Sequence, residues 1–226
     1  MRYQYLLIDN DNTLMDFAAA ERKALLDVLQ HFSLPADNAV CQTYHAINDA
    51  QWKALERGET TQSRLRIERF GLLLEALGRT EADPRAMSDR YNTALGSHAD
   101  LLPGAEDFIR TLHGYMKIAL VSNGISAIQR SRLAKCPLTP LLDAIVISEE
   151  VGAAKPDPAL LHIALEQLGC TDKRLAVMMG DSLTADIPAA QRAGVDSIFF
   201  SPAGKTSASA TYTARSYQDA LRILMG

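Results

Sequence analysis

Long apolar runs, cysteine and excess positive charge are scarce in this sequence, and each scarcity argues against a class of protein. No apolar run approaches the roughly 20 residues that a membrane-spanning helix requires, and the N-terminal MRYQYLLIDND lacks a signal-peptide cleavage pattern. A formal net charge of −4 gives no support for nucleic acid or acidic membranes as partners. The three cysteines, Cys41, Cys136 and Cys170, show no metal-ligand spacing. We therefore expect free thiols in a cytoplasmic protein that binds neither nucleic acid nor membrane.

The chain divides into a short first strand, a helical block and a second part of different periodicity. Its 226 residues are enough for one large domain or two small ones, and the composition is that of an ordinary globular protein. A strand and a loop are expected up to about position 15. Apolar residues at helical spacing, such as Leu25, Val28 and Leu29, then predict about four helices between residues 16 and 99.

From position 100 onward, short apolar runs alternate with helical stretches. The runs end in small or polar residues and read KIALVSNG, DAIVIS, LAVMMGDS and DSIFFSP. This alternation predicts an α/β fold, a Rossmann-like parallel sheet with helices on both faces. We expect residues 1–15 and 100–226 to form that core and residues 16–99 to be an all-helical insertion. Residues 204–214, GKTSASATYTA, are expected to be only a polar loop.

Two aspartates directly follow the first predicted strand. Side chains at positions i and i+2 of an extended chain point the same way, so Asp9 and Asp11 leave the strand side by side while Asn10 turns away. Two carboxylates this close repel each other unless a cation or a shared proton relieves them. The pair therefore indicates a site and not a structural feature.

Three further polar clusters end predicted strands or lie near them. Each alone has an ordinary explanation: a chance match, a turn, a solvated lysine or a helix N-cap. Ligands of parallel α/β sheets bind beyond the carboxyl ends of the strands, so all four clusters together predict one site there. The clusters are Asp9-Asn10-Asp11-Asn12-Thr13, Ser122-Asn123-Gly124, Lys155-Pro156, and Gly180-Asp181-Ser182 with Asp186.

These four motifs, in this order, resemble those of the haloacid dehalogenase-like superfamily of phosphatases. The resemblance covers essentially the whole chain and implies that residues 16–99 are the mobile helical cap of that superfamily. Within it, the chain is similar to the pyrimidine 5′-nucleotidases that clear modified nucleotides. That similarity rests on TLMDFAAAERKAL, INDAQWKALERGETTQSRLRIERF, ISEEVGAAKPDP and MGDSLTADI. Asn12 departs from the Gly or Asp that many members carry, but it keeps a small polar residue in the turn.

The resemblance implies a Mg²⁺-dependent phosphatase, with Mn²⁺ as a substitute metal, that acts through an aspartyl-phosphate. Asp9 is the expected nucleophile, and Asp11 protonates the leaving oxygen and then deprotonates the attacking water. The metal ligands implied are the Asp9 carboxylate, the Asp11 backbone carbonyl and the Asp181 carboxylate, a set of oxygens that suits Mg²⁺. Asp186 and Thr13 are expected to support the metal site from behind these ligands.

The phosphoryl oxygens are expected to be held by Asn10, Ser122, Asn123 and Lys155, where transition-state charge gathers. The resemblance also implies the substrate class, a small (deoxy)pyrimidine nucleoside 5′-monophosphate. Phe17 and Trp52 are candidates for lining its pocket, with apolar packing as the competing explanation for both. The sequence leaves open whether the protein is a monomer or a homodimer.

Several alternatives remain open from the sequence. A phosphatase of this superfamily could act on a small phosphosugar or on phosphoglycolate, and a phosphosugar mutase would use the same aspartates. A dehalogenase is disfavoured because it needs neither Asp11 nor the Asp181 and Asp186 pair. A non-enzymatic phospho-receiver module is disfavoured because it has no helical insertion of this size.

Overall fold

The computed structural model describes residues 2–79 and 81–226, and its core is a parallel β-sheet. Within these residues the sheet has six strands in the order β3-β2-β1-β4-β5-β6, and every neighbouring pair is parallel. The α/β fold expected from the sequence is thereby confirmed. The strands are β1 (Tyr5–Ile8), β2 (Lys117–Ser122), β3 (Ala144–Ile147), β4 (Ala176–Gly180), β5 (Asp196–Phe200) and β6 (Tyr212–Ala214).

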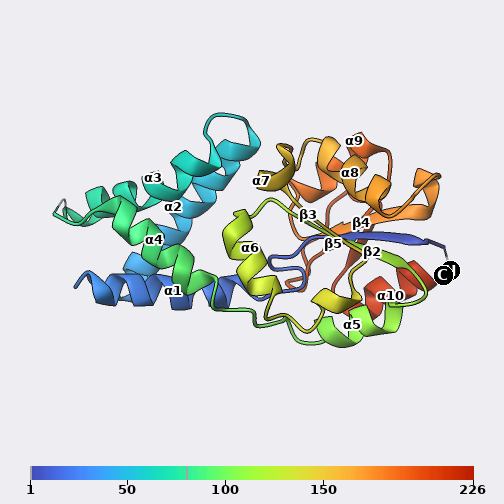
Figure 1. Cartoon of the computed structure of the whole chain (residues 1–226), viewed down its shortest axis with the longest axis horizontal. Helices are drawn as coiled ribbons and strands as arrows, with labels where there is room; N and C mark the ends of the chain where they lie inside the picture. Colours follow the sequence, from blue (N-terminus) through green and yellow to red (C-terminus); the bar gives the residue numbers. More distant parts are fainter. Residues whose placement is uncertain (1, 80) are drawn as a thin grey trace.

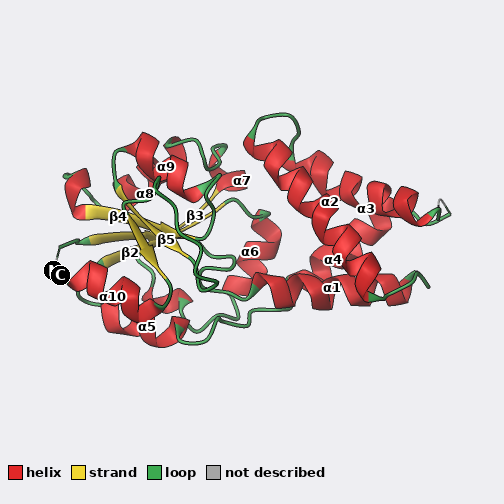
Figure 2. Ribbon diagram, turned by 180° about the vertical axis from the view of Figure 1, so that it is seen from behind, coloured by secondary structure: helices red, strands yellow, loops and turns green. Residues whose placement is uncertain are grey.

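Helices cover both faces of the sheet because successive residues of a strand point to opposite sides. Leu6 and Ile8 of β1 belong to the apolar cluster that contains Phe108, whereas Leu7 belongs to the one that contains Leu160. Figure 2 shows α5 and α10 on the first face and α8 and α9 on the second. The helices of this part are α5 (Ala105–Leu112), α6 (Ser126–Leu133), α7 (Ser148–Val151), α8 (Ala159–Gln167), α9 (Asp186–Ala193) and α10 (Tyr217–Met225), with short 3-10 turns at Thr139–Leu141 and Lys173–Leu175.

Four further helices, here called the four-helix block, lie beside the sheet and are inserted between β1 and α5 (Figure 1). Each begins at a side chain that accepts a hydrogen bond from the first turn, which is the usual way to satisfy free backbone N–H groups. The apolar cluster of the block continues into the core through Ile125 and Ile128, next to α6 and within it. The helices are α1 (Phe17–His31), α2 (Asn38–Glu56), α3 (Gln62–Leu77) and α4 (Pro84–Leu95). That this block is a separate, mobile cap domain stays a prediction.

The prediction of an uninterrupted polar loop at residues 204–214 is wrong. Its last three residues, Tyr212–Ala214, form β6, which pairs with β5 at the edge of the sheet. A three-residue edge strand buries little and is too short to show a two-residue period, so its sequence looks like a loop. The three cysteines are free thiols, as expected. None of the helices described combines the length and the apolar character needed to cross a bilayer.

Candidate active site

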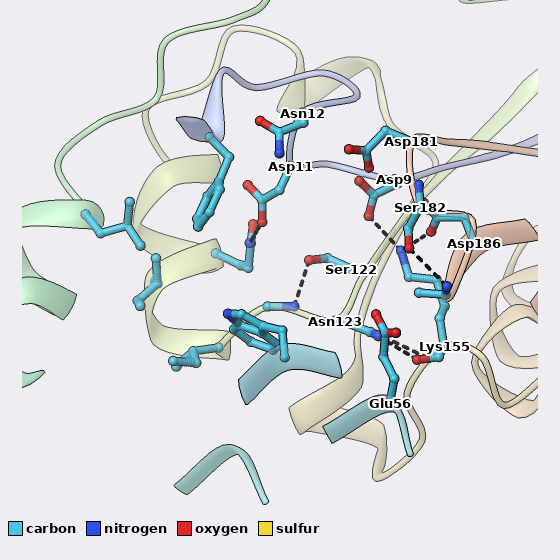
Figure 3. A pocket seen from close by; sticks show the side chains of 18 of the residues that line it. Asp9, Asp11, Asn12, Glu56, Ser122, Asn123, Lys155, Asp181, Ser182 and Asp186 are labelled. Carbon is cyan, nitrogen blue, oxygen red and sulfur yellow. Dashed lines mark hydrogen bonds and ion pairs between the residues drawn. The ribbon is translucent and has the colours of Figure 1, made fainter. Parts of the chain in front are cut away.

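The candidate site lies where three neighbouring strands end. Asp9 follows β1, Ser122 closes β2 and Asp181 follows β4, and β1 pairs with both other strands, so the three residues meet at one edge of the sheet. Lys155 reaches the same place from the loop between α7 and α8. These residues line a cavity of about 220 Å³ between the sheet and the four-helix block (Figure 3).

Three carboxylates lie close together in the lining of this cavity. Asp9, Asp181 and Asp186 each offer an oxygen atom, and these atoms all lie within 4.8 Å of one another. Burial, together with the Asp186 and Asp11 charges, outweighs the attraction of Lys155 and raises the pKa of Asp9 to about 7. Burial and the charges of Asp9 and Asp186 raise the pKa of Asp181 to about 8. The cluster is therefore short of positive charge.

Lys155 is the cation that the described structure places inside this cluster. Its side chain is only 2% exposed, and its Nζ lies 2.6 Å from Asp9 Oδ1 and 2.8 Å from Asp186 Oδ1. Burial alone would lower the pKa of Lys155, but the two carboxylates raise it above its ordinary value. The ammonium group also donates to the Val121 carbonyl at 2.8 Å. Lys155 is thus a fixed positive charge beside Asp9.

Two neighbours hold this arrangement in place. The Asn123 side chain brackets the Lys155 backbone, accepting from its N–H at 2.8 Å and donating to its carbonyl at 2.7 Å. Asn123 therefore positions the lysine, a function that its sequence context did not indicate. A Cβ atom at Gly180 would stand 2.2 Å from Asp186 Oδ2, so glycine is required for Asp186 to approach the strand end.

The residues present fit a hard divalent cation. Mg²⁺ binds carboxylate oxygens and tolerates few protein ligands, because it keeps several of its waters. Asp9 is buried and Asp181 partly buried, and burial and the neighbouring carboxylates raise both pKa values despite Lys155, so a divalent cation would stabilise their ionised forms. Asp186 is already engaged by Lys155 and by the Ser182 backbone N–H, which donates to its Oδ2 at 3.0 Å. Because both oxygens of Asp186 already have partners, Asp9 and Asp181 are the better metal ligands.

Asp11 is held apart from the three-carboxylate cluster. Its Oδ2 accepts from Gln129 Nε2 at 2.6 Å and its Oδ1 accepts from Arg132 Nη1, both residues lying on α6. Figure 3 shows the Asp11 carboxylate turned away from Asp9 and Asp181. The guanidinium group of Arg132 also donates to the His98 carbonyl at 2.9 Å, in the segment that returns from the four-helix block to the core. Gln129 and Arg132 thus connect Asp11 to that segment.

Asn10, Thr13 and Asn12 occupy different surroundings, although they share one loop. Asn10 is buried and its amide donates to Gln129 Oε1 at 2.5 Å, so only its backbone remains for a phosphate. Thr13 is buried outside the cavity lining, and its carbonyl accepts from the Tyr217 hydroxyl at 2.7 Å. Asn12 adopts a left-handed conformation with φ of 58°, which asparagine tolerates better than most residues.

The four-helix block supplies the opposite wall of the cavity. Phe17 and Trp52 line it, as the sequence suggested. Two residues that the sequence did not single out, Glu56 and Arg69, also line it. Burial raises the pKa of Glu56, whose side chain reaches toward the Lys155 loop in Figure 3. Nearby, Gln62 Nε2 donates to the Asn123 carbonyl at 2.8 Å, so the block contacts the core beside the site.

Three of the residues missed share a sequence signal, which is a polar side chain on the buried face of a helix. Arg69 lies four residues after Leu65 and four before Leu73, so it falls within the apolar stripe of α3. Gln129 and Arg132 likewise stand among the buried residues of α6. Buried polar side chains are seldom placed without partners, so such positions point to a network or a ligand.

Comparison with known proteins agrees with this geometry. The family model described as haloacid dehalogenase-like hydrolase matches residues 3–194. The pyrimidine 5′-nucleotidase PynA of Streptococcus pneumoniae is 36% identical over 99% of this chain and 96% of its own, and the pyrimidine 5′-nucleotidase YjjG of Escherichia coli is 31% identical over 86% and 84%. The magnesium-bound crystal structure of the HAD-hydrolase YfnB of Bacillus subtilis superposes with a TM-score of 0.93 over both whole chains at 33% identity. The chain belongs to the haloacid dehalogenase-like hydrolase family.

Proposed function

We propose that this hydrolase is a Mg²⁺-dependent phosphatase that cleaves (deoxy)pyrimidine nucleoside 5′-monophosphates through an aspartyl-phosphate. The observation that carries the proposal is the buried Asp9 carboxylate. It lies 2.6 Å from a fixed ammonium group and close to the Asp181 carboxylate, at the floor of the cavity. Phosphate esters hydrolyse very slowly in water, so a nucleophile, charge neutralisation and proton transfer must all be supplied.

Asp9 is the nucleophile in this mechanism. A carboxylate oxygen of Asp9 attacks phosphorus, the bond between phosphorus and the ester oxygen breaks, and the nucleoside leaves with a proton from Asp11. For this step the Asp11 side chain turns from Gln129 and Arg132 into the cavity that it lines. Water then attacks the phosphorus of the aspartyl-phosphate while Asp11 takes its proton, and inorganic phosphate and free Asp9 are restored. Lys155 favours the ionised, nucleophilic form of Asp9 because an adjacent positive charge stabilises it.

The end of the sheet that carries Asp9 also holds the phosphoryl oxygens. Ser122 is buried, and its Oγ accepts from the Gly124 N–H at 3.0 Å, which leaves its own O–H free to donate to phosphate. Lys155 adds a positive charge beside Asp9. Mg²⁺ bound by Asp9 and Asp181 would neutralise the phosphate charge and so lower the barrier to attack. Asp186 orients Lys155, and through it the nucleophile.

Substrate choice falls to the four-helix block, because the floor recognises only a phosphate. At about 220 Å³ the cavity is smaller than the roughly 300 to 1,000 Å³ typical of ligand sites, which favours a compact leaving group. Phe17 and Trp52 offer aromatic faces on which a base can stack. Two relatives above 30% identity are named pyrimidine 5′-nucleotidases, which supports a pyrimidine over a purine.

A kinetic panel tests this proposal. Values of kcat/KM would be measured for dUMP, dTMP, UMP, AMP, GMP and phosphoglycolate at fixed Mg²⁺, with EDTA as the metal-free control. We expect the pyrimidine nucleotides to lead and EDTA to abolish turnover. Higher kcat/KM for AMP, GMP or phosphoglycolate would overturn the pyrimidine assignment while leaving a phosphatase. Full activity in EDTA would overturn the metal dependence.

A further inference from the structure

We propose that Arg69 determines substrate specificity by donating hydrogen bonds to a carbonyl oxygen of the pyrimidine base. This inference rests on the proposed function and adds a residue that selects the leaving group. Arg69 lies on α3, in the wall of the cavity that faces the catalytic floor. Its side chain is almost completely buried, with 2% of the residue exposed.

Helical spacing explains how a polar group comes to lie there. On α2, Asn48 lies four residues before the cavity-lining Trp52, and on α1 Glu21 lies four residues after the cavity-lining Phe17. Residues four apart occupy the same face of a helix, so each helix presents one aromatic and one polar side chain inward. These polar side chains form a hydrogen-bond network that ends at Arg69.

The contacts of this network fix the position of the guanidinium group. Arg69 Nη1 donates to Asn48 Oδ1 at 2.9 Å, and Asn48 Nδ2 donates to Glu21 Oε1 at 2.7 Å. The guanidinium carbon also lies 4.5 Å from the ring centroid of Tyr91 and 5.3 Å from that of Phe70. A planar group that is stacked on one face and bonded at one edge has little rotational freedom, which suits recognition of a ligand.

Arg69 forms no ion pair within the described chain, and the acid of its network, Glu21, reaches it only through Asn48. Its hydrogen-bond partners there are all neutral: the Asn48 amide at 2.9 Å, and the Asn92 amide and Arg66 carbonyl at the longer distances of 3.5 and 3.4 Å. A guanidinium group has five N–H donors, so these contacts do not exhaust it. Burying the remaining N–H donors of a cation without acceptors is unfavourable, and a ligand acceptor in the adjoining cavity would relieve this.

A pyrimidine carbonyl matches these donors. Uracil and thymine carry two carbonyl oxygens and cytosine carries one, and all are acceptors without a competing negative charge. The phosphate of the same molecule is claimed by Lys155 and Ser122 at the sheet edge. The base then lies between Phe17 and Trp52, with its carbonyl edge toward α3. Adenine has no carbonyl group, so AMP cannot form this interaction, and its larger base also fits the cavity less well.

The test compares Arg69→Met with Arg64→Met on dUMP and on deoxyribose 5-phosphate, which is the same ester without a base. Arg64 lies on the same helix, and its side chain is 68% exposed, so it controls for the substitution itself. A hydrogen bond to a charged group contributes enough to change kcat/KM by about tenfold to a hundredfold. We expect Arg69→Met to lose that factor on dUMP only and Arg64→Met to behave as wild type on both substrates.

A binding measurement supplies a second readout that does not depend on turnover. Deoxyuridine, the neutral product, would be titrated calorimetrically into each variant, and we expect only Arg69→Met to bind it more weakly. If Arg69→Met does not fold, as judged by thermal unfolding, Arg69→Gln replaces it, because glutamine keeps an amide donor for Asn48 and should show the same selective loss. Equal losses on dUMP and deoxyribose 5-phosphate, or unchanged deoxyuridine affinity, would overturn the inference.

The wild-type rates separate this inference from the proposed function. If wild type prefers dUMP to deoxyribose 5-phosphate and Arg69→Met keeps the same preference, the inference about Arg69 is wrong and the nucleotidase function stands. If wild type itself shows no preference for dUMP, the nucleotide assignment fails, and the role of Arg69 in base recognition fails with it. A larger loss on phosphoglycolate than on dUMP would assign Arg69 to a carboxylate and also overturn the inference.

Discussion

Replacing Lys155 by methionine should destabilise the protein far more than a lysine substitution at the surface. Lys155 is buried, and its ammonium group lies between Asp9 and Asp186 at 2.6 and 2.8 Å. Methionine fills a similar volume but leaves three carboxylates within 4.8 Å of one another without the cation that separates them. The uncompensated negative charge then opposes folding directly.

The size of the effect follows from burial. Removing one partner of a buried ion pair costs about 3–5 kcal/mol, and a chain of this length changes its Tm by roughly 2–4 °C per kcal/mol. The expected fall in Tm for Lys155→Met is therefore roughly 6–20 °C in EDTA at pH 8. The matched control is Lys117→Met, because Lys117 pairs with Asp143 at 2.7 Å but is 61% exposed. An exposed pair contributes at most about 1 kcal/mol, so the control should lose less than about 4 °C.

Differential scanning calorimetry at pH 8 and pH 5.5, with and without Mg²⁺, measures these shifts. The pKa of Asp9 is already raised to about 7 by burial, and removing Lys155 raises it further, so at pH 5.5 Asp9 takes up a proton and part of the loss disappears. Added Mg²⁺ should also recover part of the stability, since it supplies positive charge to the same carboxylates. A Tm for Lys155→Met within about 2 °C of the Lys117→Met value at pH 8 would refute the reasoning.

Three further expectations concern the carboxylates. Asp9→Asn should fold, with a metal-free Tm at pH 8 no lower than that of wild type. It should lose nearly all turnover, and an Asp9→Asn protein that keeps more than a small percentage of activity contradicts a covalent mechanism. Asp11→Asn should lose about 10²–10⁴-fold on dUMP but less on p-nitrophenyl phosphate, with a burst of nitrophenol; equal losses and no burst count against Asp11 as the acid. Finally, burial raises the pKa of Asp9 to about 7 and that of Asp181 to about 8, above the ordinary value of 3.8. Between about pH 4 and 8 the folded state therefore binds more protons than the unfolded state, and the metal-free protein loses stability as pH rises. The gain in Tm on adding Mg²⁺ should thus be larger at pH 8 than at pH 5.5, and a gain that shrinks with rising pH would show that these carboxylates are not the metal ligands.

The sequence by itself was enough to predict the sheet and the floor of the site. An apolar run followed at once by a polar residue is a local pattern, and it is visible at Asp9, Ser122 and Asp181. Parallel strands place all their carboxyl ends at the same edge, so the convergence of these residues follows from the fold class alone. The membership of the chain in its hydrolase family could be inferred from the same motifs.

Only the tertiary structure decided what each polar side chain touches. Gln129 and Arg132 reach Asp11 across more than a hundred positions of sequence, and Asn123 proves to bracket Lys155. Local patterns cannot predict such pairs, because the free energy of a buried polar group depends on the partner that packing brings to it.

Arg69 shows most clearly what the sequence determines and what only the tertiary structure determines. Its place within the apolar stripe of α3 is readable from the sequence, but a charged residue there is compatible with a surface helix, a core network or a binding site. The structure resolves the choice because α2 and α4 pack against α3, with α1 packed on α4, and together they bury the guanidinium group beside neutral amides and leave it facing a cavity. Burial of that charge is a property of the four helices together, which no single segment of the sequence contains.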